Sequence, residues 1–439
     1  MTKRYLVETF GCQMNVHDSE RLSGLLERAG YVPATAPEEV DLLVINTCSV
    51  REKAAEKLFA RLDRYKNMSP EARPTIAVTG CVAQQEGENI LDRAPAVDVI
   101  IGTQALEKLP AAIETAMESG ASYVDINPYD NVSFPLGVVK REDRVRAFIT
   151  IIEGCNDFCS FCVVPYTRGK ERMRPMADIL EEANGIAEKG HRELHLLGQI
   201  VNHYQAPDDP DCDFPELLQR LEHVPGIDRI RFASPHPRHV SPRMIEAIAT
   251  LPKVCKHLHL PVQSGSTRML SLMRRRHTRE RYLALVQDIR RQIPAINLST
   301  DVIVGFPGET IDDFEETLSL IDQVKYHGMF SFKYSERPQT LASQKMNETV
   351  SESEKSRRLT EVQTLQKKIQ LALHSEMIGE VCEVLVESKS RRREGEFSGR
   401  TSGNVIVNFP SLANCVGRLV RVEIIRAGPN SVWGNQVAS

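Results

Sequence analysis

The segment Ile151–Cys162 reads IIEGCNDFCSFC and places Cys155, Cys159 and Cys162 within eight residues. The run before them, RAFITIIEG, is rich in the β-branched and aromatic residues of a buried strand, so the cysteines follow the carboxyl end of a predicted strand. A structural zinc site uses four ligands, yet the next cysteine, Cys212, lies 50 residues further on. Three ligands on one short loop would leave a metal position open to a small molecule.

Strand and helix patterns alternate around this loop, over residues 141–372. We predict six strands there, within RAFITIIEGC, ELHLLGQIV, RIRFASPHP, HLHLPVQSG, LSTDVIVGFPGE and MFSFKYSE. Six βα units fit an incomplete (β/α)6 barrel or a doubly wound sheet. In both architectures the chemistry lies in the loops that follow the strands.

Residues 1–119 repeat a related pattern. RYLVETFGC, DLLVINTC and TIAVTGC are short apolar runs that each end in a cysteine, and helical patterns separate them. This alternation predicts a parallel α/β sheet, in which Cys12, Cys48 and Cys81 would meet at the edge formed by the carboxyl ends of the strands. Cysteine also packs well as a small apolar residue, so three buried thiols without a ligand are the alternative.

The rest of the chain separates these units and extends them. Residues 120–140 contain Pro and Gly without clear periodicity and are interpreted as a linker. A polar helix is expected from about Ser353 to Met377. The last part, 373–439, has short strand patterns with turn signals, which predicts a small β-barrel of the oligonucleotide-binding kind. The predicted fold class is therefore α/β with a C-terminal β-barrel.

Composition limits the class of protein. The 439 residues are 41% hydrophobic and 26% charged, with a formal net charge of −4, so nucleic-acid binding would have to rest on local basic patches. No apolar run reaches the length that crosses a bilayer, and we expect a cytoplasmic protein with no membrane partner. In that reducing compartment ten cysteines favour metal ligands or free thiols over disulfides.

The spacing of Cys155, Cys159 and Cys162, with Phe161 directly before the last cysteine, resembles the signature of radical S-adenosylmethionine (SAM) enzymes. That resemblance implies a [4Fe-4S] cluster held by the three cysteines, with the open iron chelated by the methionine part of SAM. The reduced cluster of such enzymes cleaves SAM to a 5′-deoxyadenosyl radical.

With the second triplet included, the whole chain resembles the radical SAM methylthiotransferases. The motifs TFGCQMNVHDSERLSGLL, NTCSVREKAAEKL, GCVAQQEGE, GCNDFCSFCVVPYTRGKERMRP and STDVIVGFPGET carry the likeness. They favour the branch that modifies isopentenyl-adenosine in tRNA over relatives that modify threonylcarbamoyl-adenosine or a ribosomal aspartate. The resemblance implies a second [4Fe-4S] cluster at Cys12, Cys48 and Cys81, a radical SAM domain in the centre and a TRAM domain at the carboxyl end.

The family resemblance also implies a mechanism with two SAM molecules per turnover. One SAM donates a methyl group to a sulfur on the auxiliary cluster. The other yields the radical that removes hydrogen from carbon 2 of the adenine, which then accepts the methylthio group. The protein must hold these groups together and exclude water, and the target base must leave the anticodon-loop stack. A sulfur donor and an electron donor are also needed, and the sequence does not specify either.

Cofactor-binding residues are expected in the loops after the central strands, because glycine and turn residues there permit close approach to SAM. The predicted set is Phe161, Gln199, Asn202, Ser234, Gln263, Ser264, Gly265, Asp301, Gly305 and Glu309. One motif departs from the family pattern LLGQNVNSY, since this chain reads LLGQIVNHY. Ile200 and His203 replace an amide and a serine, and Ile200 is therefore left outside the predicted site.

The RNA partner is expected to be the tRNA anticodon stem-loop, bound by a monomer. Local basic runs would contact it, first RGKERMR just after the radical cluster and then KSRRR in the small β-domain. The predicted RNA contacts are Arg168, Lys170, Arg172, Arg174, Lys389, Arg391, Arg392 and Arg393. A competing hypothesis makes the chain an RNA-binding scaffold whose cysteines hold zinc, and each basic run could also be a solvated face.

Overall fold

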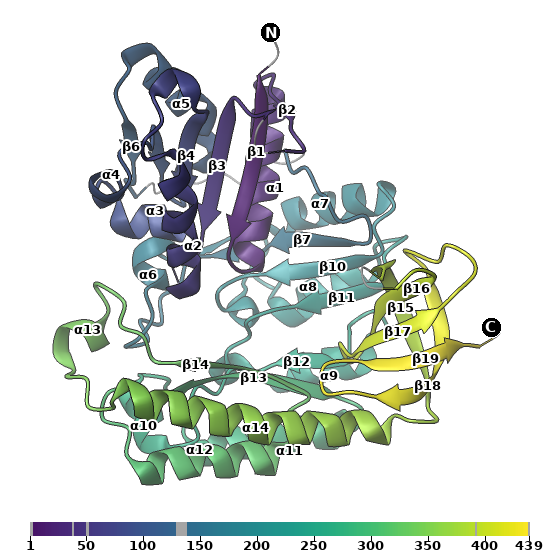
Figure 1. The fold of residues 1–439 in the computed structure, drawn as a ribbon. Helices are drawn as coiled ribbons and strands as arrows, with labels where there is room; N and C mark the ends of the chain where they lie inside the picture. The colour runs from purple at the N-terminus through teal and green to yellow at the C-terminus, as the bar shows by residue number, and fades with distance from the viewer. Residues whose placement is uncertain (1–2, 37–38, 50–51, 129–137, 391–392, 438–439) are drawn as a thin grey trace.

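The computed structural model describes residues 3–36, 39–49, 52–128, 138–390 and 393–437. Figure 1 shows three parts that follow one another along the chain: an α/β domain, a set of parallel strands covered by helices, and a small β-barrel at the carboxyl end. Within the described residues, no helix combines the length and the apolar character needed to cross a membrane.

The N-terminal domain is built on a six-stranded parallel sheet with the order β2-β1-β3-β4-β5-β6. Its central strand, β3, is buried along all six residues, which explains its run of large apolar side chains. The strands are β1 (Arg4–Phe10), β2 (Val32–Pro33), β3 (Leu42–Thr47), β4 (Thr75–Thr79), β5 (Val99–Ile101) and β6 (Tyr123–Asp125). The α-helices are α1 (Gln13–Arg28), α2 (Glu52–Leu62), α3 (Cys81–Glu86), α4 (Asn89–Arg93) and α5 (Leu109–Ser119).

The three strands that we predicted here, each ending at a cysteine, are confirmed as β1, β3 and β4. The predicted start of the linker at residue 120 is wrong, because β6 pairs with β5 and completes the sheet. Most of the remaining predicted linker, residues 129–137, lies outside the described residues.

The central part contains the six predicted parallel strands in two three-stranded sheets, β11-β10-β7 and β12-β13-β14. A parallel bridge between Ile230 and Val254 joins the two sheets, so the strands follow one another as in an incomplete (β/α)6 barrel. The strands are β7 (Arg146–Thr150), β10 (Glu193–Leu197), β11 (Arg229–Phe232), β12 (His257–His259), β13 (Asn297–Val304) and β14 (Gly328–Lys333). After β7, two short antiparallel strands, β8 (Ile152–Glu153) and β9 (Arg172–Met173), pair with each other and enclose a long loop; we call this unit the β8–β9 hairpin.

Helices cover the outer face of this barrel, and side chains alternate along the strands. On β13, Val302 packs in the core under the helices, whereas Asp301 points to the inner face. The α-helices of the central part, including α6 beside the cysteine cavity, are α6 (Val164–Thr167), α7 (Met176–Glu188), α8 (Phe214–Glu222), α9 (Pro242–Thr250), α10 (Thr267–Leu272), α11 (Arg279–Gln292), α12 (Ile311–Val324), α13 (Leu341–Lys345) and α14 (Glu352–Glu376). The polar helix expected from about Ser353 is α14, and it runs across the predicted domain boundary at residue 372.

The C-terminal part is the closed barrel β15-β16-β17-β19-β18, which confirms the predicted small β-barrel. Its strands are β15 (Val381–Lys389), β16 (Glu396–Thr401), β17 (Ile406–Pro410), β18 (Leu419–Ala427) and β19 (Val432–Gln436). Alternating apolar residues fill its interior, among them Val384, Phe409 and Val422.

Arginines at the start of β11 attach this small barrel to the central strands. Arg229 donates to the Arg400 carbonyl at 2.5 Å, and Arg231 donates to the Thr401 and Ser402 carbonyls at 2.6 and 3.0 Å. Burial alone would raise the pKa of Glu193, but Arg231 beside it holds that pKa well below its usual range. The buried ion pair therefore supports the contact between the two parts.

Candidate active site

One cavity of about 250 Å³ lies at the junction of the N-terminal domain and the central barrel, and all six predicted ligand cysteines line it. Cys12, Cys48 and Cys81 come from the first, and Cys155, Cys159 and Cys162 from the second. The structure therefore brings together two triplets that are separated by more than 70 residues of sequence.

The N-terminal triplet lies at the carboxyl ends of the strands, as predicted. Cys12 caps α1, Cys48 follows β3, and Cys81 is the first residue of α3. Gly80 permits this last turn, because it has a φ of +92° and a side-chain carbon there would lie 2.3 Å from Asn46 Oδ1. The hydrogen bond with Cys48 lowers the pKa of Cys12 to about 5, with burial acting against it and Arg168 in support.

The central triplet occupies a loop that the β8–β9 hairpin closes. Gly154 begins the loop with a φ of +83°, and a side chain there would collide with the Lys170 carbonyl. Ser160 fixes the middle of the loop, since its N–H donates to the Met273 carbonyl at 3.1 Å and its hydroxyl to the Leu272 carbonyl at 2.7 Å. Burial raises the pKa of Cys155 to about 11 and that of Cys162 to about 12.

Each triplet supplies three thiols to the cavity. Among the described residues, no three His, Cys, Asp or Glu side chains are placed as they would be around one metal ion. In a four-iron cluster each thiolate binds a different iron, so the sulfur atoms lie further apart than around one zinc. Each triplet could hold such a cluster with one iron left open toward the shared cavity.

Two buried arginines line the cavity, and they differ in their partners. Arg168, 2% exposed, pairs with Asp18 of α1 at 2.6 Å and with Glu153 of β8 at 3.2 Å. Arg275, 6% exposed, lies 3.6 Å from Cys159 Sγ and donates to the Pro261 carbonyl at 3.0 Å. No carboxylate of the described residues pairs with Arg275, and its Nε is buried without a hydrogen-bond partner.

Half of the predicted cofactor-binding residues line the cavity. They are Phe161, Gln199, Ser234, Gln263 and Asp301. Ser234 and Gln263 have φ values of +63° and +74°, which is costly for residues other than glycine and is frequent at functional sites. Gln199 Oε1 is buried without a hydrogen-bond partner and is thus available to a ligand.

The other half lies behind the cavity wall and supports it. Asn202 exchanges two hydrogen bonds with the backbone of His236, at 3.0 and 2.8 Å. Glu309 accepts from the Gly305 N–H and pairs with Arg358 at 2.6 Å, and burial raises the pKa of this carboxyl. Ser264 and Gly265 are packed on Thr317 of α12. The structure therefore gives Asn202, Ser264, Gly265, Gly305 and Glu309 structural contacts rather than a place in the cavity lining.

The departure from the family motif also falls at the cavity. Ile200, which we left outside the predicted site, lines the cavity. His203 lies outside the lining, and its Nδ1 is 2.9 Å from a carboxylate oxygen of Glu171. Of the two departures from the expected motif, only Ile200 is therefore part of the cavity lining.

The predicted RNA contacts divide between buried and exposed residues. Arg168 and Arg174 are both 2% exposed and paired with carboxylates, Arg174 with Glu182, so the expectation that they contact RNA was wrong. Arg172 is partly buried against Glu153, whereas Lys170 and Lys389 are exposed. Arg393 is exposed beside Glu396, and Arg391 and Arg392 lie outside the described residues.

Sequence reasoning missed several cavity residues, among them Asp157, His236 and Arg275. The sequence marks Arg275 as part of the basic run Arg274–Arg276, but a run of charged residues does not show which side chain points into the cavity. Asp157 could also have been found from the sequence, since it lies between Cys155 and Cys159 in the cysteine loop.

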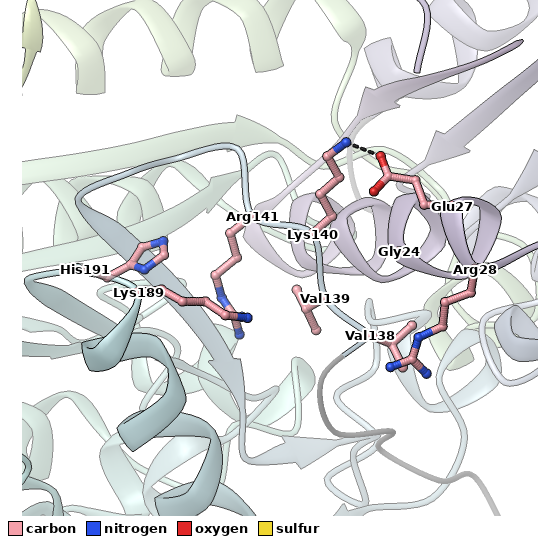
Figure 2. A pocket seen from close by; sticks show the side chains of 9 residues that line it. All are labelled: Gly24, Glu27, Arg28, Val138, Val139, Lys140, Arg141, Lys189 and His191. Carbon is pink, nitrogen blue, oxygen red and sulfur yellow. Dashed lines mark hydrogen bonds and ion pairs between the residues drawn. The ribbon is translucent and has the colours of Figure 1, made fainter. Parts of the chain in front are cut away.

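A second cavity, of about 510 Å³, lies between α1 and the segment Val138–Arg141. Figure 2 shows its basic lining, with Lys140 paired to Glu27. Arg141 is paired with Glu182, and no cysteine reaches this cavity. Despite its larger volume, it lacks the groups for redox chemistry, and the cysteine cavity is the better candidate.

Three family models match consecutive parts of the chain. Residues 4–102 match an uncharacterized protein family, UPF0004, residues 149–321 match the radical SAM superfamily, and residues 375–436 match the TRAM domain. Each segment covers most of one of the three parts of the fold.

Full-length relatives are also found. The chain is 44% identical over 441 residues to a tRNA-2-methylthio-N(6)-dimethylallyladenosine synthase of Geotalea uraniireducens, covering 99% of both proteins. A protein of the same name from Paraburkholderia xenovorans is 44% identical, over 100% of this chain and 98% of the relative.

Solved structures share the fold at low sequence identity. The radical SAM methyltransferase TsrM from Kitasatospora setae, with cobalamin and a [4Fe-4S] cluster bound, matches with a TM-score of 0.55 and 13% identity, over 91% of this chain and 77% of that one. The cobalamin-dependent SAM radical enzyme OxsB matches with a TM-score of 0.52 and 15% identity, over 83% and 56%.

Proposed function

The chain belongs to the family of tRNA-2-methylthio-N(6)-dimethylallyladenosine synthases, which are radical SAM enzymes, and on that basis we propose how it acts on its substrate. It adds a methylthio group to carbon 2 of dimethylallyl-adenosine, also called isopentenyl-adenosine, next to the tRNA anticodon. Each turnover uses two SAM molecules, one as methyl donor to a sulfur and one as the source of the 5′-deoxyadenosyl radical.

The observation that carries this proposal is that both cysteine triplets line one cavity. Cys155, Cys159 and Cys162 would hold the radical SAM cluster, and Cys12, Cys48 and Cys81 an auxiliary [4Fe-4S] cluster. When bound, the two clusters supply the electron for SAM cleavage and a site for the sulfur that is transferred. Because the target C–H bond is not acidic enough for a side-chain base, cofactors must carry this chemistry.

The protein's own residues hold and enclose these groups. Phe161, Gln199 and Asp301 line the cavity beside the central triplet and would bind SAM. Ser234 and Gln263, in the loops after β11 and β12, have strained backbone conformations and line the same cavity. One shared cavity would keep the distances between radical, adenine and sulfur short, and a substrate bound in it would exclude water and competing reductants.

The tRNA would be bound mainly by the C-terminal barrel and by exposed cations near the cavity. Lys389 on β15 and Lys170 in the β8–β9 hairpin are exposed and lie on two different parts of the fold. A tRNA that spans both could place its anticodon loop at the cavity, in agreement with the RNA-binding role expected of a TRAM domain.

Two measurements test the proposal. Anaerobically purified protein should be brown and contain about eight irons and a matching amount of sulfide per chain. Nucleoside mass spectrometry of tRNA from a strain without this gene should show that the methylthio form of isopentenyl-adenosine is lost. Colourless protein loaded with zinc would support the scaffold hypothesis instead. An unchanged methylthio-isopentenyl-adenosine level would point to threonylcarbamoyl-adenosine or a ribosomal aspartate as substrate.

A further inference from the structure

Large aromatic side chains are exposed at few places in this protein. Among the described residues, those that are at least 40% exposed are Phe158, Tyr166, Phe330 and Phe332. Phe158 lies inside the cysteine loop with a φ of +43°, and its ring is 6.0 Å from that of Tyr166. Phe330 and Phe332 are on β14, the last strand of the central barrel.

The register of β14 shows where its two phenylalanines point. Phe330 pairs with Asp301 and Phe332 with Ile303 on β13, and paired residues of parallel strands share one face of the sheet. Asp301 lines the cysteine cavity, so this face is the inside of the barrel. Lys333, the residue after Phe332, belongs to the outer face, where it pairs with Glu352 of α14.

Contacts connect Phe330 to the cysteine cavity. The rings of Phe330 and His259 lie 6.0 Å apart, edge to face, and His259 Nε2 is 3.4 Å from Asp301. Phe330 is nevertheless 57% exposed and Phe332 40% exposed. Among the described strands β14 pairs only with β13, and Figure 1 shows it as the last strand of its sheet with α14 running alongside.

Exposed phenyl rings on the inner face of a barrel are unfavourable in water unless a ligand covers them. The ligand that the proposed reaction brings to this cavity is an unpaired base with an apolar five-carbon chain. Proteins that bind unpaired RNA bases stack them on aromatic rings, and an apolar chain gains equally from contact with phenyl groups.

We propose that Phe330 and Phe332 form the surface on which the dimethylallyl-adenosine of the tRNA packs, and that Phe158 and Tyr166 stack an adjacent unpaired base. This inference rests on the proposed substrate. It assigns two roles: the barrel pair recognises the modified nucleoside, and the loop pair contributes affinity that does not depend on the modification.

The test compares the binding of two synthetic anticodon stem-loops to the anaerobic holoenzyme, one with and one without the dimethylallyl group. Wild type should prefer the modified loop. Phe330→Ala and Phe332→Ala should weaken binding of the modified loop by roughly tenfold and reduce the preference.

Tyr166→Ala should weaken the binding of both stem-loops by a similar factor and keep the preference for the modified one. Phe330→Leu, which keeps an apolar side chain without an aromatic face, should lose less than Phe330→Ala.

Ile311→Ala is the matched control, because Ile311 is 60% exposed at the start of α12. It should bind both loops as wild type does. SAM affinity, measured in parallel, should stay unchanged in the Phe330 and Phe332 variants. A preference that survives both alanine substitutions, or a loss of SAM affinity instead, would overturn the inference. A wild-type enzyme without any preference would contradict the proposed substrate itself.

Discussion

A single buried guanidinium, that of Arg275, lies against the sulfur of Cys159 without a carboxylate partner in the described chain. A buried charge is expensive unless an opposite charge compensates it, and the nearest groups that become anionic are the thiols of the central triplet. Its neighbours Arg274 and Arg276 have φ values of +57° and +56°, which is a further strain at this position. The residue is therefore well placed to balance the charge of a cluster.

We predict that Arg275→Gln lowers the reduction potential of the radical SAM cluster. A positive charge and a hydrogen bond near a cluster sulfur stabilise the reduced, more negative state, and both are lost in this variant. A tenfold change in the ratio of reduced to oxidised cluster corresponds to about 59 mV. Redox titration monitored by electron paramagnetic resonance measures the shift.

Arg274→Gln is the control for Arg275→Gln, because it removes the same charge from an exposed neighbour with a similar backbone conformation. It should shift the potential less. Equal shifts in the two variants would show that general charge, and not the contact with Cys159, sets the potential.

Single-cysteine variants should show that the two triplets have different roles in the reaction. Cys159→Ala should abolish SAM cleavage, because the radical cluster loses a ligand. Cys48→Ala should still produce 5′-deoxyadenosine but stop thiomethylation, since only the auxiliary cluster is affected. Chromatography of the two products measures this, and methylthio product formed by Cys48→Ala would refute the auxiliary role.

At the scale of elements, the β8–β9 hairpin joins the two cysteine-bearing parts through Arg168. The Arg168 side chain pairs with Asp18 of α1 and with Glu153 of β8, and all three side chains are buried. Breaking a buried ion pair by removing one partner typically costs about 3–5 kcal/mol, because the remaining charge stays unpaired.

Arg168→Gln should therefore lower the melting temperature of the protein, in the iron-free as well as the iron-loaded form. Differential scanning calorimetry under anaerobic conditions measures this. Arg172→Gln is the matched control, since Arg172 contacts the same Glu153 at 3.4 Å but is 19% exposed. Similar melting temperatures for Arg168→Gln and wild type would contradict the bridging role.

The sequence predicted the elements that carry a strong pattern and a chemical marker. β1, β3 and β4 were found because each is an apolar run that ends in a cysteine. β5 and β6 have three residues each, too few for a periodic pattern, and were missed. Arg168 was assigned to RNA because it lies in a basic run, whereas its partner Asp18 is 150 residues away in sequence. Likewise, the motif around Glu309 marked the right loop but not the direction of its side chain.

At the scale of the whole molecule, the attachment of the C-terminal barrel determines where a bound tRNA lies relative to the cavity. Arg231 donates to two carbonyls of that barrel and pairs with buried Glu193 at 3.0 Å. Asn297 adds a hydrogen bond to the Gly403 carbonyl at 2.8 Å. Several donors from the central strands thus hold one turn, Thr401–Val405, in place.

Arg231→Ala should loosen this attachment. Hydrogen exchange at residues 401–405 should become faster, and the KM for tRNA should rise more than kcat falls, because the cavity itself is unchanged. Asn297→Ala, which removes one hydrogen bond, should have a smaller effect on both. Exchange rates in Arg231→Ala equal to those of wild type would show that the attachment does not depend on this residue.

Most acceptors in this attachment are main-chain oxygens, those of Glu383, Arg400, Thr401, Ser402 and Gly403. Side-chain acceptors add to them: the Ser402 hydroxyl accepts from the Lys256 N–H at 2.9 Å, and the Glu383 and Glu387 carboxylates each lie 3.4 Å from an arginine of the central part. Every amino acid supplies the same carbonyl, so mutations of the attached turn at positions other than Ser402 can change its side chains without removing an acceptor. During evolution, the small barrel could therefore vary the residues that face nucleic acid while keeping its docking geometry. Selection for a new RNA partner would not have to rebuild the interface with the catalytic part.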